Sequence, residues 1–311
     1  MKECSIKRHS KWNIVKREKV LYFFVLPAIV TTFIFAYLPM FGNIIAFMDY
    51  DMTKGWMGLG SDFVGLKWFE QIFSDKFFID LILRTIYYNF LILVVGFPAP
   101  IILALLINEV RAKRFKKTVQ TISYLPYFVS WVTIASLIYL FLSTDSTGVI
   151  NNLREAMGME RYLFMKDADF FPWLLLLSSI YKTAGWGSIL YLAAISSIDS
   201  QLYEAAMMDG AGKWKQFCYV TFPGILPTMV IMMIMNLGSF FTSNFDQVYN
   251  LQNQLISSST NVISVYTFTT GVQGQQFSIA AAVGLFQGIM NAILLVISNF
   301  VSKKVTDYGL F

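Results

Sequence analysis

The chain is almost empty of the side chains that enzymes use for nucleophilic and metal chemistry. His9 is its only histidine, and Cys4 and Cys218 are its only cysteines. A Ser/His/Asp or Cys/His catalytic set needs a histidine beside the nucleophile, and a zinc site needs several closely spaced Cys, His or carboxylate ligands. The sequence therefore predicts that this chain is not an enzyme, holds no metal and binds no cofactor.

Two glycine-containing stretches have only a superficial likeness to phosphate-binding loops. Gly60 and Gly65 have the spacing of a P-loop, but Leu66 stands where that loop requires lysine. The stretch that begins at Gly210 is too short, and no strand precedes it. We therefore expect that the chain does not itself bind ATP.

The most informative polar segment is 199–211, which follows a long apolar run. Asp199 or Ser200 can cap a helix, because their side-chain oxygens accept free backbone N–H groups. Glu204 then lies near the positive end of that helix, and Gly210 favours a stop or a sharp turn. One helical face would carry Leu202, Ala205, Ala206 and Asp209. The pattern predicts a short helix that offers small side chains and a carboxylate to another protein, although an ordinary interfacial helix would share these features.

The composition indicates that lipid is the solvent around most of the chain. It is 56% hydrophobic and 14% charged, with a mean hydropathy of +0.56, whereas soluble domains carry roughly a quarter charged residues. A transmembrane helix needs about 20 mostly apolar residues. Six stretches meet this requirement: 20–48, 81–108, 118–142, 172–198, 224–245 and 277–301. The sequence predicts an all-α membrane protein with six transmembrane helices.

The basic residues predict the orientation of these spans. Sixteen of the 24 lysines and arginines fall in the tail 1–19, in the connections 109–117 and 199–223, and after 301. Basic residues gather on the cytoplasmic side of membrane proteins, so both ends should be cytoplasmic. We expect a basic cytoplasmic tail at 1–19 and one membrane domain at 20–311. The net charge of +5 is accounted for in this way, and we expect no nucleic-acid partner.

The segment between the fourth and fifth predicted spans resembles the EAA signature of ABC importer permeases. The resemblance is carried by Glu204-Ala205-Ala206, Asp209-Gly210-Ala211, Phe217 and Phe222-Pro223. Leucine is usual in that family where this chain has Phe222, which is a mild departure. Further stretches similar to the oligosaccharide branch of these permeases are 186–195, 245–249, 282–286 and 307–311.

The resemblance implies a type I ABC importer permease in a bacterial cytoplasmic membrane. Segment 199–223 would then hold the coupling helix, which docks into a cleft on a cytoplasmic ATPase subunit. The coupling residues carried over are Glu204, Ala205, Ala206, Asp209, Gly210 and Ala211. The implied partners are a second, different permease subunit, two ATPase subunits that bind ATP and Mg, and an external solute-binding protein that delivers an oligosaccharide.

Three polar residues at similar depth suggest where such a sugar would pass. Lys182, Asn236 and Gln287 each lie about ten to twelve residues inside a predicted span, near the bilayer midplane. Sugars need hydrogen-bond donors and acceptors for their hydroxyls and aromatic rings against their C–H faces. The other candidates are Tyr181, Trp186, Ser239, Phe240, Ser243 and Asn291. The amides could instead bond helix to helix, and Lys182 could meet either a sugar carboxylate or a backbone carbonyl.

Three other functions compete with oligosaccharide import. A permease of this family could carry another class of solute. A secondary transporter would be driven by an ion gradient, and such proteins commonly carry acidic residues inside their spans. No aspartate or glutamate falls within any predicted span, which disfavours that class. A membrane-bound enzyme is disfavoured by the missing catalytic groups.

Overall fold

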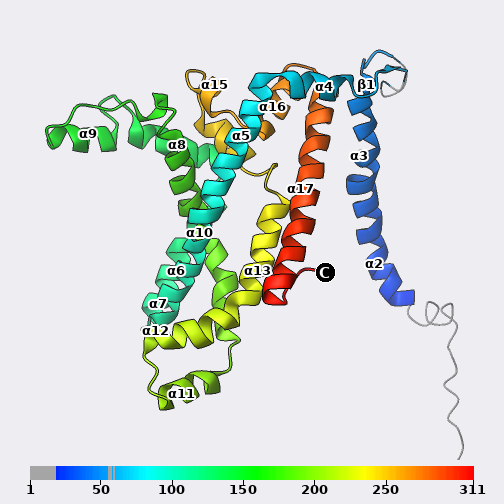
Figure 1. The fold of residues 1–311 in the computed structure, drawn as a ribbon. Coiled ribbons are helices and arrows are strands. Elements are labelled where there is room, and N and C mark those ends of the chain that lie inside the picture. The colour runs from blue at the N-terminus through cyan, green and yellow to red at the C-terminus, as the bar shows by residue number, and fades with distance from the viewer. Residues whose placement is uncertain (1–18, 55–57, 59) are drawn as a thin grey trace, which may run out of the picture.

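The computed structural model describes residues 19–54, 58 and 60–311, so the predicted basic tail lies outside the described residues except for Lys19. Long helices run side by side between two ends of the molecule (Figure 1). The elements in chain order are α2 (Lys19–Thr32), η1 (Phe33–Tyr37), α3 (Leu38–Met40), η2 (Phe41–Phe47), β1 (Met48–Asp49), β2 (Asp62–Phe63), α4 (Lys67–Ser74), α5 (Lys76–Leu91), η4 (Ile92–Gly96), α6 (Pro98–Glu109), α7 (Lys113–Tyr124), η5 (Leu125–Phe128), α8 (Trp131–Leu142), α9 (Val149–Ala156), η6 (Phe164–Lys166), α10 (Phe171–Ser196), α11 (Ser200–Met208), α12 (Lys213–Gln216), η7 (Phe217–Thr221), α13 (Phe222–Gly238), α14 (Phe245–Leu251), α15 (Ser257–Thr260), α16 (Ile263–Phe268), η8 (Thr269–Gln273) and α17 (Phe277–Thr306).

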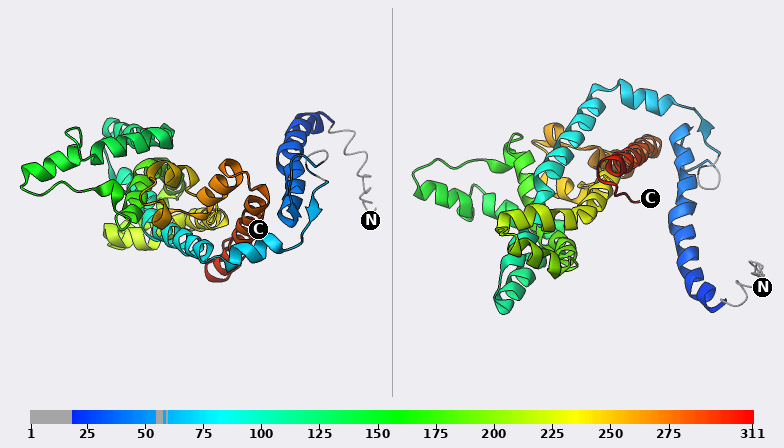
Figure 2. Two further views of the ribbon diagram at one scale, coloured as in Figure 1. Left: turned by 90° about the horizontal axis from the view of Figure 1, so that it is seen from above. Right: turned by 60° about the horizontal axis from the view of Figure 1, so that its bottom comes forward.

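The first long helix stands apart from the bundle. Segments α2 to η2 form one continuous helix over Lys19–Phe47, and all views show α2 away from the other helices (Figures 1 and 2). None of the α2 residues is buried. A helix that is apolar all round requires lipid or another apolar surface as its neighbour. Its far end packs on the bundle, since Ala46 and Phe47 of η2 belong to the same hydrophobic cluster as Ile279 of α17. Just beyond the helix, Ser278 Oγ of α17 donates to Met48 O and accepts from Tyr50 N.

The second span is the continuous helix Lys76–Glu109, built from α5, η4 and α6. A π-helical turn at Ile92–Gly96 precedes Pro98, which cannot supply the N–H of a regular helical turn. Below that turn α6 packs along α10. Their shared core with α13 consists of Ile101, Ala104, Ile107, Tyr191, Leu192, Ile195 and Ile225. These residues form a hydrophobic core between α6, α10 and α13.

The predicted span over 118–142 is a bent pair of helices rather than one continuous helix. Helices α7 and η5 meet α8 at a break of 100°. Pro126 ends the regular hydrogen bonding, and the Ser130 Oγ restarts it by accepting from Thr133 N at 3.2 Å. Just before the break, α7 lies very close to α10 at Gly185. Only glycine permits this approach, because a Cβ at this position would collide with the Ser123 carbonyl. The two halves of this span therefore point in different directions.

Four helices among the described residues are long and apolar enough to cross a membrane: Lys19–Phe47, Lys76–Glu109, Lys213–Gly238 and Phe277–Thr306. The bent pair α7–α8 would make a fifth if it counts as one span. Helix α10 has 26 residues, hence a length of about 39 Å at 1.5 Å per residue, but it carries Lys182 and is not among the four. The fold is thus a mostly helical membrane protein with four or five strongly apolar spans.

The predicted fifth span has different bounds from the observed helix. The helix begins at Lys213, before the expected start at 224, and ends at Gly238, before the expected end at 245. Residues 239–244 form a turn, and α14 begins after Asn244, whose φ is 64°. Of the pathway candidates in this predicted span, Asn236 lies in the helix, whereas Ser239, Phe240 and Ser243 lie in the turn.

Candidate functional site

A cavity of about 470 Å³ lies between α5, η4, α6, α10, α13 and the turn 239–244. Its wall combines hydrogen-bonding side chains with aromatic rings. The polar members are Asn89, Ser179, Thr183, Asn236, Ser239, Ser243 and Asn244, and the aromatic members are Phe97, Tyr127, Trp186, Tyr191 and Phe240. The wall carries no charged side chain. Such a wall can bind a solute that presents many hydroxyl groups.

Five of the nine residues predicted for the pathway lie on this wall. Trp186, Asn236, Ser239 and Phe240 line the cavity, as does Ser243. The other four candidates, Tyr181, Lys182, Gln287 and Asn291, are not among the lining residues of this cavity. Tyr181 is 62% exposed on the surface of α10. The structure therefore separates candidates that a depth argument had grouped together.

A stacked aromatic pair forms one side of the cavity. The Tyr127 and Trp186 rings lie 4.7 Å apart at an angle of 7°, and Phe128 meets the Trp186 ring edge-on at 5.6 Å. Both stacked residues line the cavity. Tyr127 was not among the predicted residues, because it lies in η5 beside the break before α8, which hydropathy alone does not reveal. A pair of parallel rings offers a flat apolar surface to the C–H face of a sugar.

The turn 239–244 exposes backbone groups in the middle of the bundle, and three side-chain amides satisfy them. Asn89 Nδ2 donates to Phe240 O at 2.7 Å. Gln287 Nε2 donates to Phe241 O at 2.5 Å, and Asn291 Oδ1 accepts from Phe241 N at 2.8 Å. Non-helical backbone at membrane depth is tolerated only where protein or cavity water satisfies it. We call Asn89, Gln287 and Asn291 the amide clasp.

The members of the amide clasp are themselves buried, at 4–8% exposure. Asn89 Oδ1 also accepts from Ser243 Oγ at 3.1 Å and Asn244 Nδ2 at 2.5 Å. Gln287 and Asn291 thus act in packing α17 against the turn rather than on the cavity wall. Asn89 was not among the predicted residues, although a lone amide inside an apolar run is a signal that could have identified it.

Lys182 pairs with backbone carbonyls, one of its two predicted alternatives. Its Nζ donates to Tyr127 O at 3.1 Å and also to Val129 O. The ammonium group lies 5.3 Å from the centre of the Trp131 ring. These carbonyls lie at the break in α7–α8, where the helix leaves them without partners. Lys182 also borders a second cavity, of about 560 Å³, together with Asp246 and Asn250.

Segment 199–211 forms the short helix that its residues predict. The Asp199 side chain caps α11 by accepting from Gln201 N at 2.9 Å. At the other end Gly210 has a φ of +73°, with its N–H bonded to Met207 O at 3.0 Å and Ala211 N–H bonded to Ala206 O at 2.9 Å. This pair of bonds is a Schellman motif, which needs a left-handed residue. The cap and the turn confirm the predicted local structure.

Helix α11 projects from one end of the molecule, below α12 and α7 (Figure 1). None of its residues is buried, and Met208 is 88% exposed. Glu204 and Ala205 are also exposed, while Ala206 is half-buried. Lys213 of α12 forms an exposed ion pair with Glu109, at the end of α6, at 3.1 Å. Helix α11 therefore offers an open surface next to the end of α6.

Known proteins resemble this chain over nearly its whole length. Protein LplB of Bacillus subtilis (strain 168) is 40% identical over 297 residues, covering 96% of this chain and 92% of that protein. The polygalacturonan/rhamnogalacturonan transport system permease protein YteP of the same strain is 40% identical over 295 residues, covering 95% and 91%. A chain in the crystal structure of a bacterial alginate ABC transporter, in complex with an alginate pentasaccharide-bound periplasmic protein, is 37% identical with a TM-score of 0.88 over 96% of this chain and 99% of that chain.

The family description that matches this chain agrees with the resemblance seen in segment 199–223. The family described as binding-protein-dependent transport system inner membrane component matches residues 72–307. That range contains α11 and every segment that lines the 470 Å³ cavity. The chain therefore belongs to the family of binding-protein-dependent transport system inner membrane components.

Proposed function

We propose that this chain is the permease subunit of an ATP-driven ABC importer that carries an oligosaccharide. Together with a second, different permease subunit it forms the translocation pathway. The observation that carries the proposal is the uncharged, polar and aromatic cavity of about 470 Å³ in a member of this family. The names of the relatives support the choice of cargo, because they include a polygalacturonan/rhamnogalacturonan permease and an alginate transporter.

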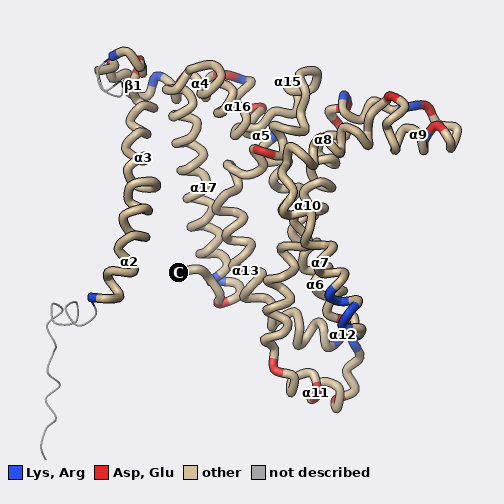
Figure 3. Tube along the Cα trace, turned by 180° about the vertical axis from the view of Figure 1, so that it is seen from behind, with Lys and Arg blue, Asp and Glu red and all other residues tan. Residues whose placement is uncertain are grey.

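The chain crosses a bacterial cytoplasmic membrane six times, with both ends in the cytoplasm. Helix α10 and the bent pair α7–α8 supply the spans that join the four strongly apolar helices. Basic residues support this orientation, because Figure 3 shows blue segments at the start of α2, on α7 and α12, and near the end of α17. All of these lie toward the end of the molecule that carries α11.

The exposed helix α11 is the coupling helix. Glu204, Ala205, Ala206, Asp209, Gly210 and Ala211 form the part that docks into a cytoplasmic ATPase subunit. Small side chains allow close approach, and the Schellman motif keeps the helix end in one geometry. ATP and Mg belong to two such ATPase subunits. The external solute-binding protein docks at the opposite end of the bundle.

Trp186, Asn236, Ser239 and Phe240 contact the sugar in the cavity, together with Tyr127 and Thr183. Amide and hydroxyl groups bond the sugar hydroxyls, and the Tyr127–Trp186 pair packs on a ring face. Lys182 stays at the break in α7–α8, since backbone carbonyls occupy its donors.

Transport by the reconstituted complex tests this function. The chain is assembled in proteoliposomes with its partner permease, the ATPase and the solute-binding protein, and uptake of labelled oligosaccharides is measured. We expect uptake that requires both ATP and the binding protein, with saturated oligogalacturonides and oligoalginates compared against neutral oligosaccharides and glycerol 3-phosphate. Uptake that proceeds on an ion gradient without ATP would contradict the importer, and preference for the non-sugar solute would contradict the cargo.

A further inference from the structure

The segment between α8 and α10 forms an arm that leaves the bundle sideways. It comprises residues 143–170 and contains α9 and η6. The arm extends away from the other helices in the side view and in the view from above (Figures 1 and 2). It lies at the end of the molecule opposite α11, near the level at which the long helices end. The bundle therefore covers little of the arm.

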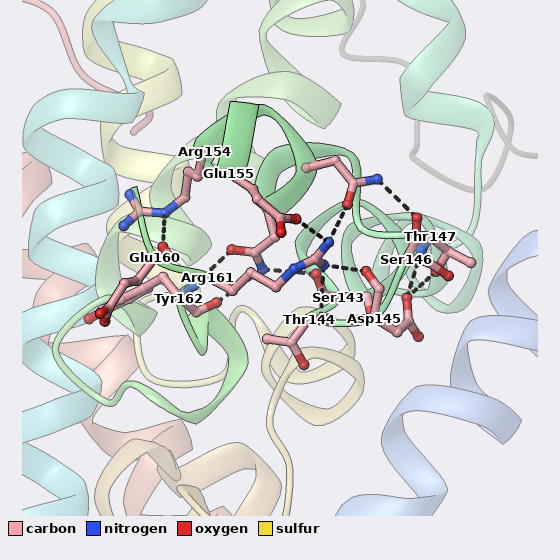
Figure 4. Close-up of polar contacts among 12 residues, drawn as sticks. Ser143, Thr144, Asp145, Ser146, Thr147, Arg154, Glu155, Glu160, Arg161 and Tyr162 are labelled. Atoms are coloured by element: carbon pink, nitrogen blue, oxygen red, sulfur yellow. Dashed lines mark hydrogen bonds and ion pairs between the residues drawn. The ribbon is translucent and has the colours of Figure 1, made fainter. Parts of the chain in front are cut away.

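Arg161 makes the arm rigid. Its guanidinium group donates to Thr144 O at 3.0 Å and Asp145 O at 2.6 Å, and also to Asn152 Oδ1 at 2.9 Å and Glu155 Oε2 at 2.7 Å (Figure 4). Four acceptors from the start of the arm and from α9 thus converge on one side chain. A guanidinium group presents its donors in a fixed plane, so these contacts fix the relative positions of the acceptors.

Asn151 ties the same helix to the end of α8. It is 0% exposed, and its Nδ2 donates to Leu142 O, Ser143 O and Tyr162 O at 2.8–3.2 Å. Its Oδ1 accepts from Tyr162 N at 2.8 Å. A buried amide with all these partners satisfied allows one orientation only. Helix α9 therefore has a set direction relative to the membrane span that precedes it.

The contacts of Arg161 and Asn151 all lie on one side of α9, and the opposite side is apolar and uncovered. Val149, Leu153 and Met157 are spaced by four residues and are 42%, 52% and 72% exposed. Ile150 lies beside them on the same face. The helix is therefore strongly amphipathic, although its polar half is bonded to its own arm.

We propose that α9 lies in the interfacial region of the lipid bilayer, with Val149, Leu153 and Met157 inserted among the acyl chains. The arm begins after Leu142, and Leu140 and Phe141 in the last turn of α8 are exposed apolar residues. Exposed apolar side chains thus occur on both sides of the junction between α8 and the arm. Figure 3 shows the charged residues of the arm at the end of the molecule opposite α11.

Lipid fits this face better than a protein partner does. Protein interfaces mix apolar contacts with about one hydrogen bond per 100–200 Å², but the polar groups of α9 are engaged within the arm. A face of apolar side chains alone, on a helix lying sideways at the level of the span ends, matches an interfacial helix. The arm would thus act as a lateral anchor of this subunit in the membrane.

Depth-dependent fluorescence quenching tests the proposal on the complete transporter in lipid nanodiscs. Cys4 and Cys218 are replaced by serine, and bimane is attached at Leu153→Cys or, as a second reporter, at Met157→Cys. The control is Glu160→Cys, an exposed position on the loop that covers the polar side of α9. We expect lipids labelled with 5-doxyl to quench the two reporters at least threefold more than the control.

Equal quenching at the reporters and the control would overturn the proposal. So would reporters that lipid does not quench but whose emission shifts when the solute-binding protein is added, since the occupant would then be that protein. Transport activity of each labelled complex shows that the fold is retained. The transport assay and the quenching measurement therefore test the proposed function and the membrane insertion of α9 separately.

Discussion

Asn291 Oδ1 accepts a hydrogen bond from the backbone N–H of Phe241 at 2.8 Å, within a buried site that joins α17 to the turn after α13. Because this N–H and the adjoining carbonyl of Phe241 have partners, α13 can end at Gly238 inside the bundle. The turn then places Ser239 and Ser243 on the cavity wall. The amide clasp thus links the packing of the bundle to the shape of the proposed pathway.

We expect Asn291→Leu to lower stability, since it leaves a buried backbone N–H unpaired. The loss should be about 1–3 kcal/mol, and Gln287→Leu should have a similar effect through Phe241 O. The measurement is thermal unfolding of the purified complex in detergent, with size-exclusion chromatography used to monitor the loss of the folded complex. Wild-type melting of both variants would show that the clasp does not hold the turn.

Asn236→Leu makes the same Asn-to-Leu change as Asn291→Leu, but at a residue on the cavity wall. Asn236 Nδ2 bonds only Met232 O within its own helix among the described contacts, so stability should change by less than about 1 kcal/mol. We expect assembly and ATP hydrolysis to persist while oligosaccharide uptake falls at least tenfold, corresponding to about 1.4 kcal/mol. Uptake at the wild-type rate would place the sugar elsewhere.

Gly210→Val should loosen the docking of the ATPase. A Cβ at this position meets no atom within 4 Å, so the cost comes from the φ of +73° alone, at about 1–2 kcal/mol or more for a β-branched residue. The control is Gly212→Val, where the φ of −70° suits any residue and space is also open. Co-purification of the ATPase should drop only for the first variant; an equal effect of both would refute the Schellman turn as the cause.

Lys182→Met should loosen the break between η5 and α8. The Tyr127 and Val129 carbonyls lose their donor, and hydrogen exchange of the amides over 127–134 should become at least tenfold faster. Lys182→Gln retains a donor and should restore part of the protection. If acidic and neutral oligosaccharides are transported equally well by both variants, Lys182 has a structural role only. Unchanged exchange in Lys182→Met would show that the break does not depend on this side chain.

Membrane topology can be tested by cysteine labelling from outside the cell. With Cys4 and Cys218 removed, a cysteine at Asn253 should react with a membrane-impermeant maleimide, and one at Lys116 should not. The expectation follows from the basic residues that gather toward the α11 end of the molecule. The reverse pattern would place both ends outside.

The segment with the strongest local signals was the most predictable. An aspartate cap and a glycine stop act within a few residues of the helix they limit, so the bounds of α11 could be read from 199–211. Apolar length likewise located most of the long helices. The family could be recognised for the same reason, since its signature lies in one continuous segment.

The bend at 129–130 and the end of α13 could not be found in this way. Hydropathy continues across both positions. Pro126 and Ser130 limit the helices at the bend, but the free carbonyls there and the turn after α13 are bonded by side chains from distant parts of the chain, such as Lys182 and Asn89. Depth alone therefore grouped Asn236 with Gln287, although one faces the cavity and the other the turn. Amide side chains at the same depth can either line a cavity or bond the backbone of a turn, and only their contacts in the folded protein distinguish these roles.

The pairing of Lys182 with Tyr127 and Val129 has a consequence for biosynthesis. A helix that carries an ammonium group near its middle enters the membrane poorly by itself, and α10 is not among the strongly apolar helices. Its two carbonyl partners precede it by 53 and 55 residues, so the ribosome delivers them first. We therefore expect the insertion of α10 to depend on the helix pair α7–α8, which is synthesised first and supplies the carbonyl acceptors for Lys182.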